Sequence, residues 1–304
     1  PSQPMTSVSL FQFSLCFKSP RTPQKCGVFV CPFFWLFGWL ILPQIAHASK
    51  TVELQANLES KLSPVEQIKA RFGKYSIESP MHSHKHGGIK FDHIGFAKDA
   101  ELGNAFTFSL RRDIDGDRDK IWPKGKERQR IEIKGYQSSP DLMKGKYAEN
   151  HLIQWYLKID KDFRINKEFC HFFQLKAVGN KNVDAPVLTL SGVTDQGKPQ
   201  LQLQWWTSDE SGRVFLTEWE ECKNKWLRCE CKVNYAKNGS IDFSLHSLDG
   251  VIDLKKQLKN LQTWRDGFDF VRPKWGIYRS LAKERDKLNP QDQIRMNNFS
   301  IQKL

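Results

Sequence analysis

Short segments in which every second residue is apolar fill the chain from Phe91 to its end, with clusters of Gly, Pro, Asn and Asp between them. Such alternation is typical of β-strands that bury one face. It predicts strands at residues 105–112, 128–136, 151–159, 169–178, 187–190, 201–206, 213–216, 228–235, 241–246, 269–279 and 293–301. The only other features are an expected helical turn at 254–261 and a polar loop at 282–291. The chain therefore predicts an all-β sandwich or jelly roll.

The segment before these strands has a different pattern. Residues 52–72 show helix-like spacing, and Pro64 after Ser63 indicates a second helix start with Ser63 as its N-cap. Residues 79–88 form a polar loop whose histidines could bind metal, although a solvated tract is the favoured interpretation. These histidines are His82, His84 and His86.

Residues 28–42 are almost wholly apolar, follow three basic residues and precede Ala46-His47-Ala48. This order is typical of a secretory signal cleaved after Ala48, and an uncleaved membrane anchor is the alternative. We therefore expect a signal peptide at 1–48, an N-terminal extension at 49–88, a jelly-roll domain at 89–304, and a secreted or periplasmic protein.

The chain is strongly basic, with a formal net charge of +13. Residues 1–48 hold three basic groups and no acid, so the expected mature chain carries +10. A basic surface favours polyanionic partners such as nucleic acid, anionic membrane or acidic polysaccharide. Expected secretion and the lack of any recognised module disfavour nucleic acid. We expect a monomer that has no membrane association once the signal is cleaved.

Four cysteines follow the expected cleavage site: Cys170, Cys222, Cys229 and Cys231. A disulfide between Cys222 and either Cys229 or Cys231 is plausible in an oxidising compartment. The spacing of these three fits no usual zinc site.

Residues 113–119, Asp-Ile-Asp-Gly-Asp-Arg-Asp, look like a calcium loop. A helical calcium hand would need Gly at its sixth position and Glu at its twelfth, where Arg118 and Lys124 stand. A solvated turn is therefore favoured, with bound calcium as the alternative.

The run at 270–281 is the most informative strand. Arg272, Lys274, Gly276 and Tyr278 share one face, while the other face is apolar. Two cations and a phenol beside a glycine, which lets a ligand approach the backbone, make a surface suited to anions. An ordinary exposed strand face is the alternative.

Two other strands also carry polar faces. In 128–134, Arg128, Arg130, Glu132 and Lys134 face one way, which is costly unless the charges pair or hold a ligand. In 169–176 Phe172, Gln174 and Lys176 share a face. By the same alternation, His171 falls on the opposite face of that strand, so it is expected to be buried or to stand behind the site.

Lys274-Trp-Gly-Ile-Tyr278 resembles the Lys-x-Gly-x-Tyr strand of jelly-roll polysaccharide lyases, which include heparin, glucuronan and alginate lyases. Arg130 and Glu132 match that family's Arg-x-Glu strand, and Gln174 matches the Gln of its Gln-x-His motif. Lys176 stands where the family has His. The resemblance covers roughly residues 90–304.

The resemblance implies β-elimination at a 4-linked uronate in an acidic polysaccharide, without a cofactor. It assigns catalysis to Tyr278, Gln174, Arg130 and Lys274. Substrate binding falls to Glu132, Lys134, Lys176, Arg272 and Arg128.

Within this scheme Tyr278 would be both base and acid if nearby cations lower its pKa toward neutrality. Lack of the family His then favours glucuronate- or mannuronate-type substrates, in which the C5 proton and O4 lie on the same side. His93 and His151 are further candidates for the base.

Two other functions are alternatives to a lyase. A hydrolase would need two placed carboxylates, and the nearest cluster, Glu218, Glu220 and Glu221, resembles a loop. The serious alternative is a non-catalytic sandwich that binds anionic polysaccharide, with sugars stacked on Trp205, Trp206 and Trp264.

Overall fold

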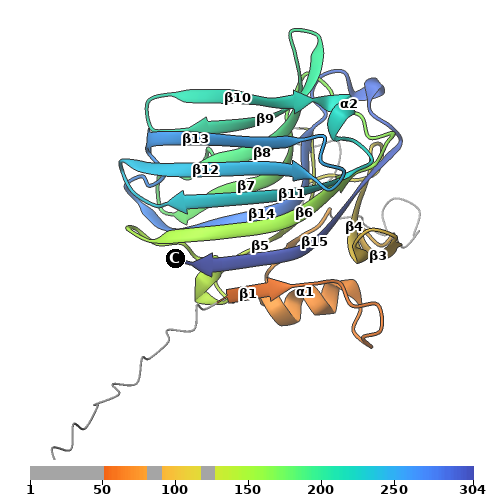
Figure 1. The fold of residues 1–304 in the computed structure, drawn as a ribbon, viewed down its shortest axis with the longest axis horizontal. Helices are drawn as coiled ribbons and strands as arrows, with labels where there is room; N and C mark the ends of the chain where they lie inside the picture. Colours follow the sequence, from red (N-terminus) through yellow and green to blue (C-terminus); the bar gives the residue numbers. More distant parts are fainter. Residues whose placement is uncertain (1–50, 81–90, 118–126) are drawn as a thin grey trace, which may run out of the picture. The chain divides into compact units, whose positions relative to one another are not determined.

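The computed structural model describes residues 51–80, 91–117 and 127–304. In this part of the chain two antiparallel β-sheets lie face to face as a sandwich (Figure 1). The prediction of an all-β jelly roll is therefore confirmed. The predicted cleavage site after Ala48 and the histidines at 82, 84 and 86 lie outside the described residues.

The first sheet has eight strands in the order β13-β12-β11-β6-β15-β4-β3, with β1 paired to β15. Their bounds are β13 Asp253–Leu261, β12 Gly239–Ser247, β11 Trp226–Asn234, β6 Asn150–Ile159, β15 Gln291–Lys303, β4 Gly103–Arg111, β3 Ile94–Asp99 and β1 Thr51–Leu54.

The second sheet has seven strands in the order β10-β9-β8-β7-β14-β5-β2. Their bounds are β10 Ser211–Glu218, β9 Lys198–Trp206, β8 Leu188–Asp195, β7 Cys170–Gly179, β14 Phe268–Ser280, β5 Arg128–Lys134 and β2 Ile77–Glu78. Helices are few among the described residues: α1 Pro64–Phe72, α2 Trp219–Cys222, and 3-10 turns at Asp141–Met143 and Arg285–Lys287.

Large aromatic side chains fill the space between the sheets. Trp155 of β6 stacks on Phe173 of β7 with ring centroids 4.2 Å apart, and Trp275 of β14 meets Phe299 of β15 at 5.3 Å. Each of these rings is almost fully buried. Burial of this apolar area is the main force that holds the sheets together.

Every strand that alternation predicted is present, with ends shifted by a few residues. The expected helical turn at 254–261 is wrong, because these residues form edge strand β13. Leu254 lies opposite Leu245 and Leu258 opposite Ile241, so its inward positions follow a period of two. Lys255, Lys256 and Lys259 charge this edge, a usual protection against unwanted pairing.

The N-terminal extension adds to both sheets. Residues 52–54 are strand rather than helix, whereas α1 begins at Pro64 behind a capping box made by Ser63 and Glu66. Phe72 at the end of α1 is fully buried and stacks on Trp275 at 5.8 Å. Strand β2 then pairs with β5 at the edge of the seven-stranded sheet.

Cys170, Cys222, Cys229 and Cys231 are free and buried, so the expected disulfide does not form. In the predicted calcium loop, Asp115 is fully buried and lies 3.0 Å from both His93 and Arg111. The expectation of a solvated turn is thus wrong at this position. Among the described residues no group of three side chains is arranged to hold a metal, and no helix is long and apolar enough to cross a membrane.

Candidate active site

Strand β14 lies between β5 and β7, which brings the predicted site strands together. Tyr278 lies opposite Arg130, and Lys274 lies opposite both Lys134 and Gln174. Alternation then places the predicted site residues on one polar face of β5, β7 and β14, which we call the trough. They are Arg128, Arg130, Glu132, Lys134, Gln174, Lys176, Arg272, Lys274 and Tyr278.

The pairing of β7 is irregular at His171. The register shifts between His171 and Phe173 on the β8 side and between Trp275 and Tyr278 on the β14 side. Phe172 and Phe173 consequently both enter the core, and His171 comes to lie opposite Tyr278. His171 is buried, as predicted, but it lies on the trough face rather than behind it. The adjacent pair Phe172-Phe173 was the signal of this bulge.

Tyr278 is surrounded by two guanidinium groups. Arg128 Nη1 donates a hydrogen bond to Tyr278 Oη over 2.7 Å, and the Arg130 guanidinium lies 3.8 Å from the centre of the ring. The ring is only 7% exposed. Burial raises the pKa of Tyr278 above its usual value, and the opposing effect of Arg130 and Arg128 is smaller. The expected lowering toward neutrality is thus wrong, and Tyr278 is protonated at neutral pH.

His171 is held against Tyr278 by its neighbours. The two ring centroids are 5.9 Å apart, and His171 Nδ1 lies 2.7 Å from Ser191 Oγ. Burial and then the positive charges of Lys274, Arg130, Lys176 and Arg128 lower the pKa of His171 to about 3. Its imidazole is therefore neutral at physiological pH, so one ring nitrogen carries no proton.

The middle of the trough is a buried ion network. Lys274 Nζ lies 2.6 Å from Glu132 and 2.7 Å from Glu78, and both carboxylates also contact Arg130. Gln174 Nε2 donates to Glu132 over 2.5 Å. Charges buried this deeply need such partners, and removing one of them would be costly.

Sequence reasoning missed Glu78, which β2 carries into this network. Its carboxylate lies 2.5 Å from Lys134, 2.7 Å from Lys274 and 2.8 Å from Arg130, and it is 3% exposed. Burial acts to raise the pKa of Glu78, but these three cations outweigh burial and hold it far below its usual range. No motif around Ile77-Glu78 marks it, because its role depends on pairing with a strand 50 residues away.

The far end of the trough holds Lys176 and Arg272, which lie opposite each other. Lys176 Nζ donates to the carbonyl of Asp184, and Arg272 Nη1 donates to that of Gly135 over 3.1 Å. Arg272 is six residues from Tyr278, or about 20 Å along the strand. Lys176 is therefore far along the strands from Tyr278, whereas His171 lies directly opposite it.

Gln174 is also displaced from Tyr278. It lies opposite Lys274, four residues from Tyr278 and so about 13 Å along the strand. Gln174 thus belongs to the ion network, and Arg128 and His171 adjoin the phenol. Arg130 and Lys274 contact both, since Arg130 pairs with Glu132 and Lys274 Nζ lies 6.0 Å from the centre of the Tyr278 ring.

The remaining candidates lie elsewhere. His151 is on β6 of the eight-stranded sheet, 3.1 Å from Glu149, and His93 pairs with Asp115. Trp264 packs against Tyr147 and Phe268, with ring centroids 5.9 and 5.7 Å away. Trp205 and Trp206 are on β9, two strands away from β7.

Gly276 permits the close approach of β14 to β5. Its φ is +138°, and a Cβ there would lie 2.1 Å from the Ile131 carbonyl oxygen. The glycine is therefore required by the backbone itself, rather than by ligand approach as the sequence suggested.

No protein-family model and no curated protein matches the sequence. Solved structures do match the fold. The marine PL-14 alginate lyase from Aplysia kurodai has a TM-score of 0.54 at 11% identity, with 84% of this chain and 100% of that chain covered. An alginate lyase from Klebsiella pneumoniae has a TM-score of 0.53 at 11% identity, with coverages of 79% and 98%. At these identities the similarity establishes a shared jelly-roll fold.

Proposed function

We propose that this protein is a secreted polysaccharide lyase that cleaves a 4-linked uronate chain by β-elimination. The observation that carries the proposal is the convergence of neutral His171, protonated Tyr278 and two arginines at one end of the trough. The fold shared with alginate lyases supports it.

In the proposed reaction His171 removes the C5 proton of the uronate. The electrons of that bond form the C4–C5 double bond, the C4–O4 bond breaks, and Tyr278 donates its proton to O4. Water then carries the proton from His171 to solvent, and the Tyr278 phenolate takes a proton from water. The chemistry balances without an oxidant or cofactor.

The arginines stabilise the charges that develop. Arg128 and Arg130 stabilise the phenolate that Tyr278 becomes, since both act to lower its pKa. Arg128, whose hydrogen bond goes to Tyr278 rather than to a carboxylate, is placed to meet the uronate carboxylate and the enolate-like transition state. One such donor contributes roughly 10²–10³ in rate in other enzymes.

The type of uronate is less restricted than the sequence suggested. The preference for glucuronate or mannuronate depended on Tyr278 acting alone. With His171 beside it, separate groups are available for the two proton transfers. The same site can therefore also cleave a uronate whose O4 and C5 proton lie on opposite sides of the sugar ring.

Tyr278→Phe tests the proposal. The wild type should give the ultraviolet absorbance of a new conjugated double bond on at least one of glucuronan, mannuronan, guluronan and heparin. Turnover by the variant should fall about 10²–10⁴-fold, while its affinity for the polymer should be retained. Tyr156→Phe, on β6 of the other sheet, is the matched control and should retain full turnover.

The competing function is a non-catalytic sandwich that binds anionic polysaccharide. It predicts polymer binding by the wild type with no new absorbance on any of these polymers. That outcome, or full turnover by Tyr278→Phe, would refute the lyase mechanism.

A further inference from the structure

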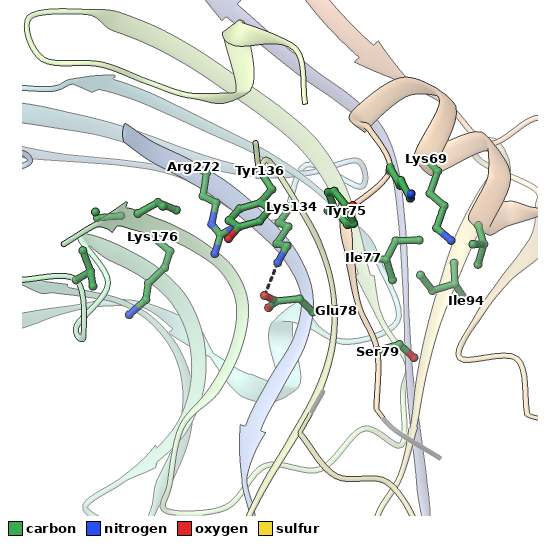
Figure 2. Close-up of a pocket in the computed structure, with 16 residues that line it drawn as sticks. Lys69, Tyr75, Ile77, Glu78, Ser79, Ile94, Lys134, Tyr136, Lys176 and Arg272 are labelled. Carbon is green, nitrogen blue, oxygen red and sulfur yellow. Dashed lines mark hydrogen bonds and ion pairs between the residues drawn. The ribbon is translucent and has the colours of Figure 1, made fainter. Parts of the chain in front are cut away.

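A cavity of about 880 Å³ lies at the far end of the trough (Figure 2). Residues of α1, β2, β3, β5, β7 and β14 line it, together with the segments that follow α1, β2, β5 and β7. Its ionisable lining, tyrosines aside, consists of one acid, Glu78, and five basic residues. The basic residues are Lys69, Lys74, Lys134, Lys176 and Arg272. The cavity is therefore a concentrated positive site in a molecule that is already basic.

The cavity is continuous with the trough. Glu78 and Lys134 line the cavity, and Glu78 also contacts Lys274 and Arg130 in the ion network. Lys134, Lys176 and Arg272 project from the same sheet face as Tyr278. A polymer that is bound at Tyr278 and follows β14 therefore reaches this cavity. The distance from Tyr278 to Arg272 along the strand is about 20 Å, which is longer than one sugar ring.

Two tyrosines give the cavity faces suited to sugar rings. Tyr75 is 53% exposed, and Lys74 Nζ lies 5.5 Å from its ring. Tyr136 lies between Lys134 and Arg272, whose charged groups are 4.7 and 4.8 Å from its ring. Aromatic rings next to cations suit a ligand with an apolar sugar face and an anionic substituent.

The positive charges are crowded. Burial and then the cations Lys274, Arg130 and Arg265 lower the pKa of Lys176 to about 7. Burial lowers that of Lys134 to about 8, with Arg272 and Lys274 adding to it and Glu78 opposing. An anion bound between these side chains would relieve the repulsion and favour their charged forms.

We propose that this cavity, the basic subsite, binds the carboxylate of a second uronate, several sugars from the bond that is cleaved. The preferred ligand is then a chain with a carboxylate on successive sugars, rather than a single uronate within a neutral chain. This inference deepens the proposed function, because it names the substrate class of the same trough, although binding is measured separately from cleavage.

The double variant Lys69→Gln/Lys74→Gln tests the basic subsite. Both side chains are exposed, so the fold should tolerate the change. The matched control is Lys61→Gln/Lys98→Gln, which removes the same charge from exposed positions that do not line the cavity. Both doubles are made in the full chain carrying Tyr278→Phe, and Kd is measured for polymannuronate, for glucuronan and for an unsaturated uronate disaccharide.

The subsite double should weaken polymer binding about tenfold relative to the control, given up to about 1 kcal/mol per exposed charge contact. The disaccharide is too short to reach both ends, so its affinity for the control double should be lower than that of the polymer. Equal polymer affinity in the two doubles, or no polymer binding by their Tyr278→Phe parent, would overturn the basic subsite. Weakened binding in the subsite double supports it even if the wild type cleaves no uronate polymer, a result that would refute only the lyase.

Discussion

Single side chains at the Tyr278 end of the trough owe their protonation states to burial. Tyr278 keeps its proton because desolvation outweighs its arginines, and His171 stays neutral because desolvation and cations act together. The pKa of Tyr278 is raised and that of His171 is lowered, so a protonated acid and a neutral base stand side by side. Their ring centroids are 5.9 Å apart. The two residues therefore have distinct, testable roles.

His171→Asn should lower kcat about 10²–10⁴-fold with little change in polymer affinity, because it removes the proposed base and keeps a polar side chain. Ultraviolet assays of turnover and a binding titration on the same polymer would measure both quantities. His246→Asn, on β12 of the other sheet, is the matched control. If Lys176→Met abolished turnover while His171→Asn did not, the base would be Lys176.

Glu78→Gln should lower the free energy of unfolding by about 3 kcal/mol, because Lys134, Lys274 and Arg130 would lose a buried counter-charge. Urea denaturation at neutral pH measures this. Glu101→Gln breaks a more exposed pair with Lys158 and should cost under about 1 kcal/mol. Equal costs for the two variants would show that the buried network is not stabilised by Glu78.

At the scale of elements, the site depends on the irregular middle of β7 and β14. The register shifts turn His171 and Tyr278 to the same face, and Gly276 lets β14 pass close to β5. Regular strands would place His171 in the core and leave the phenol without a base. The bulges are thus the local structure on which the proposed chemistry depends.

Gly276→Ala should destabilise the protein by about 3 kcal/mol, since its Cβ would meet the Ile131 carbonyl at 2.1 Å in a backbone conformation unfavourable to alanine. Gly250→Ala is the control: it also has positive φ, at +75°, but lies in open space. It should cost only about 1 kcal/mol. Similar denaturation midpoints for the two variants would mean that β5 yields to the methyl group.

At the scale of the whole molecule, the sandwich gathers positive charge along one sheet face. Strand β2 and helix α1, which precede the lyase-like strands, complete that face as well as the core. The trough and the proposed basic subsite share this face. Its charge should make binding depend on both salt and pH.

Affinity for polymannuronate or glucuronan should fall as pH rises from 6 to 9. Lys176 and Lys134, with pKa values of about 7 and about 8, are charged below and neutral above these values. Binding to an anion should therefore take up protons, which calorimetry in buffers of different ionisation enthalpy detects. Lys176→Met should weaken binding at pH 6 and flatten the pH dependence. A Kd independent of pH in the wild type would contradict this account.

The sequence by itself determined the features that depend on neighbours along the chain. Alternation set which residues of β5 share a face, so Arg130, Glu132 and Lys134 were correctly grouped. Ser63 and Glu66 marked the start of α1, because capping joins residues three positions apart. The number and order of strands likewise predicted the sandwich.

Only the tertiary structure decided which residues meet across strands and how deeply they are buried. Alternation within a strand assumes a regular register, and the shift at Phe172-Phe173 broke that assumption for His171. Glu78 reaches its cations through a two-residue strand whose partner lies far along the chain. The protonation of Tyr278 depends on desolvation by the packed fold, which no local pattern of residues specifies.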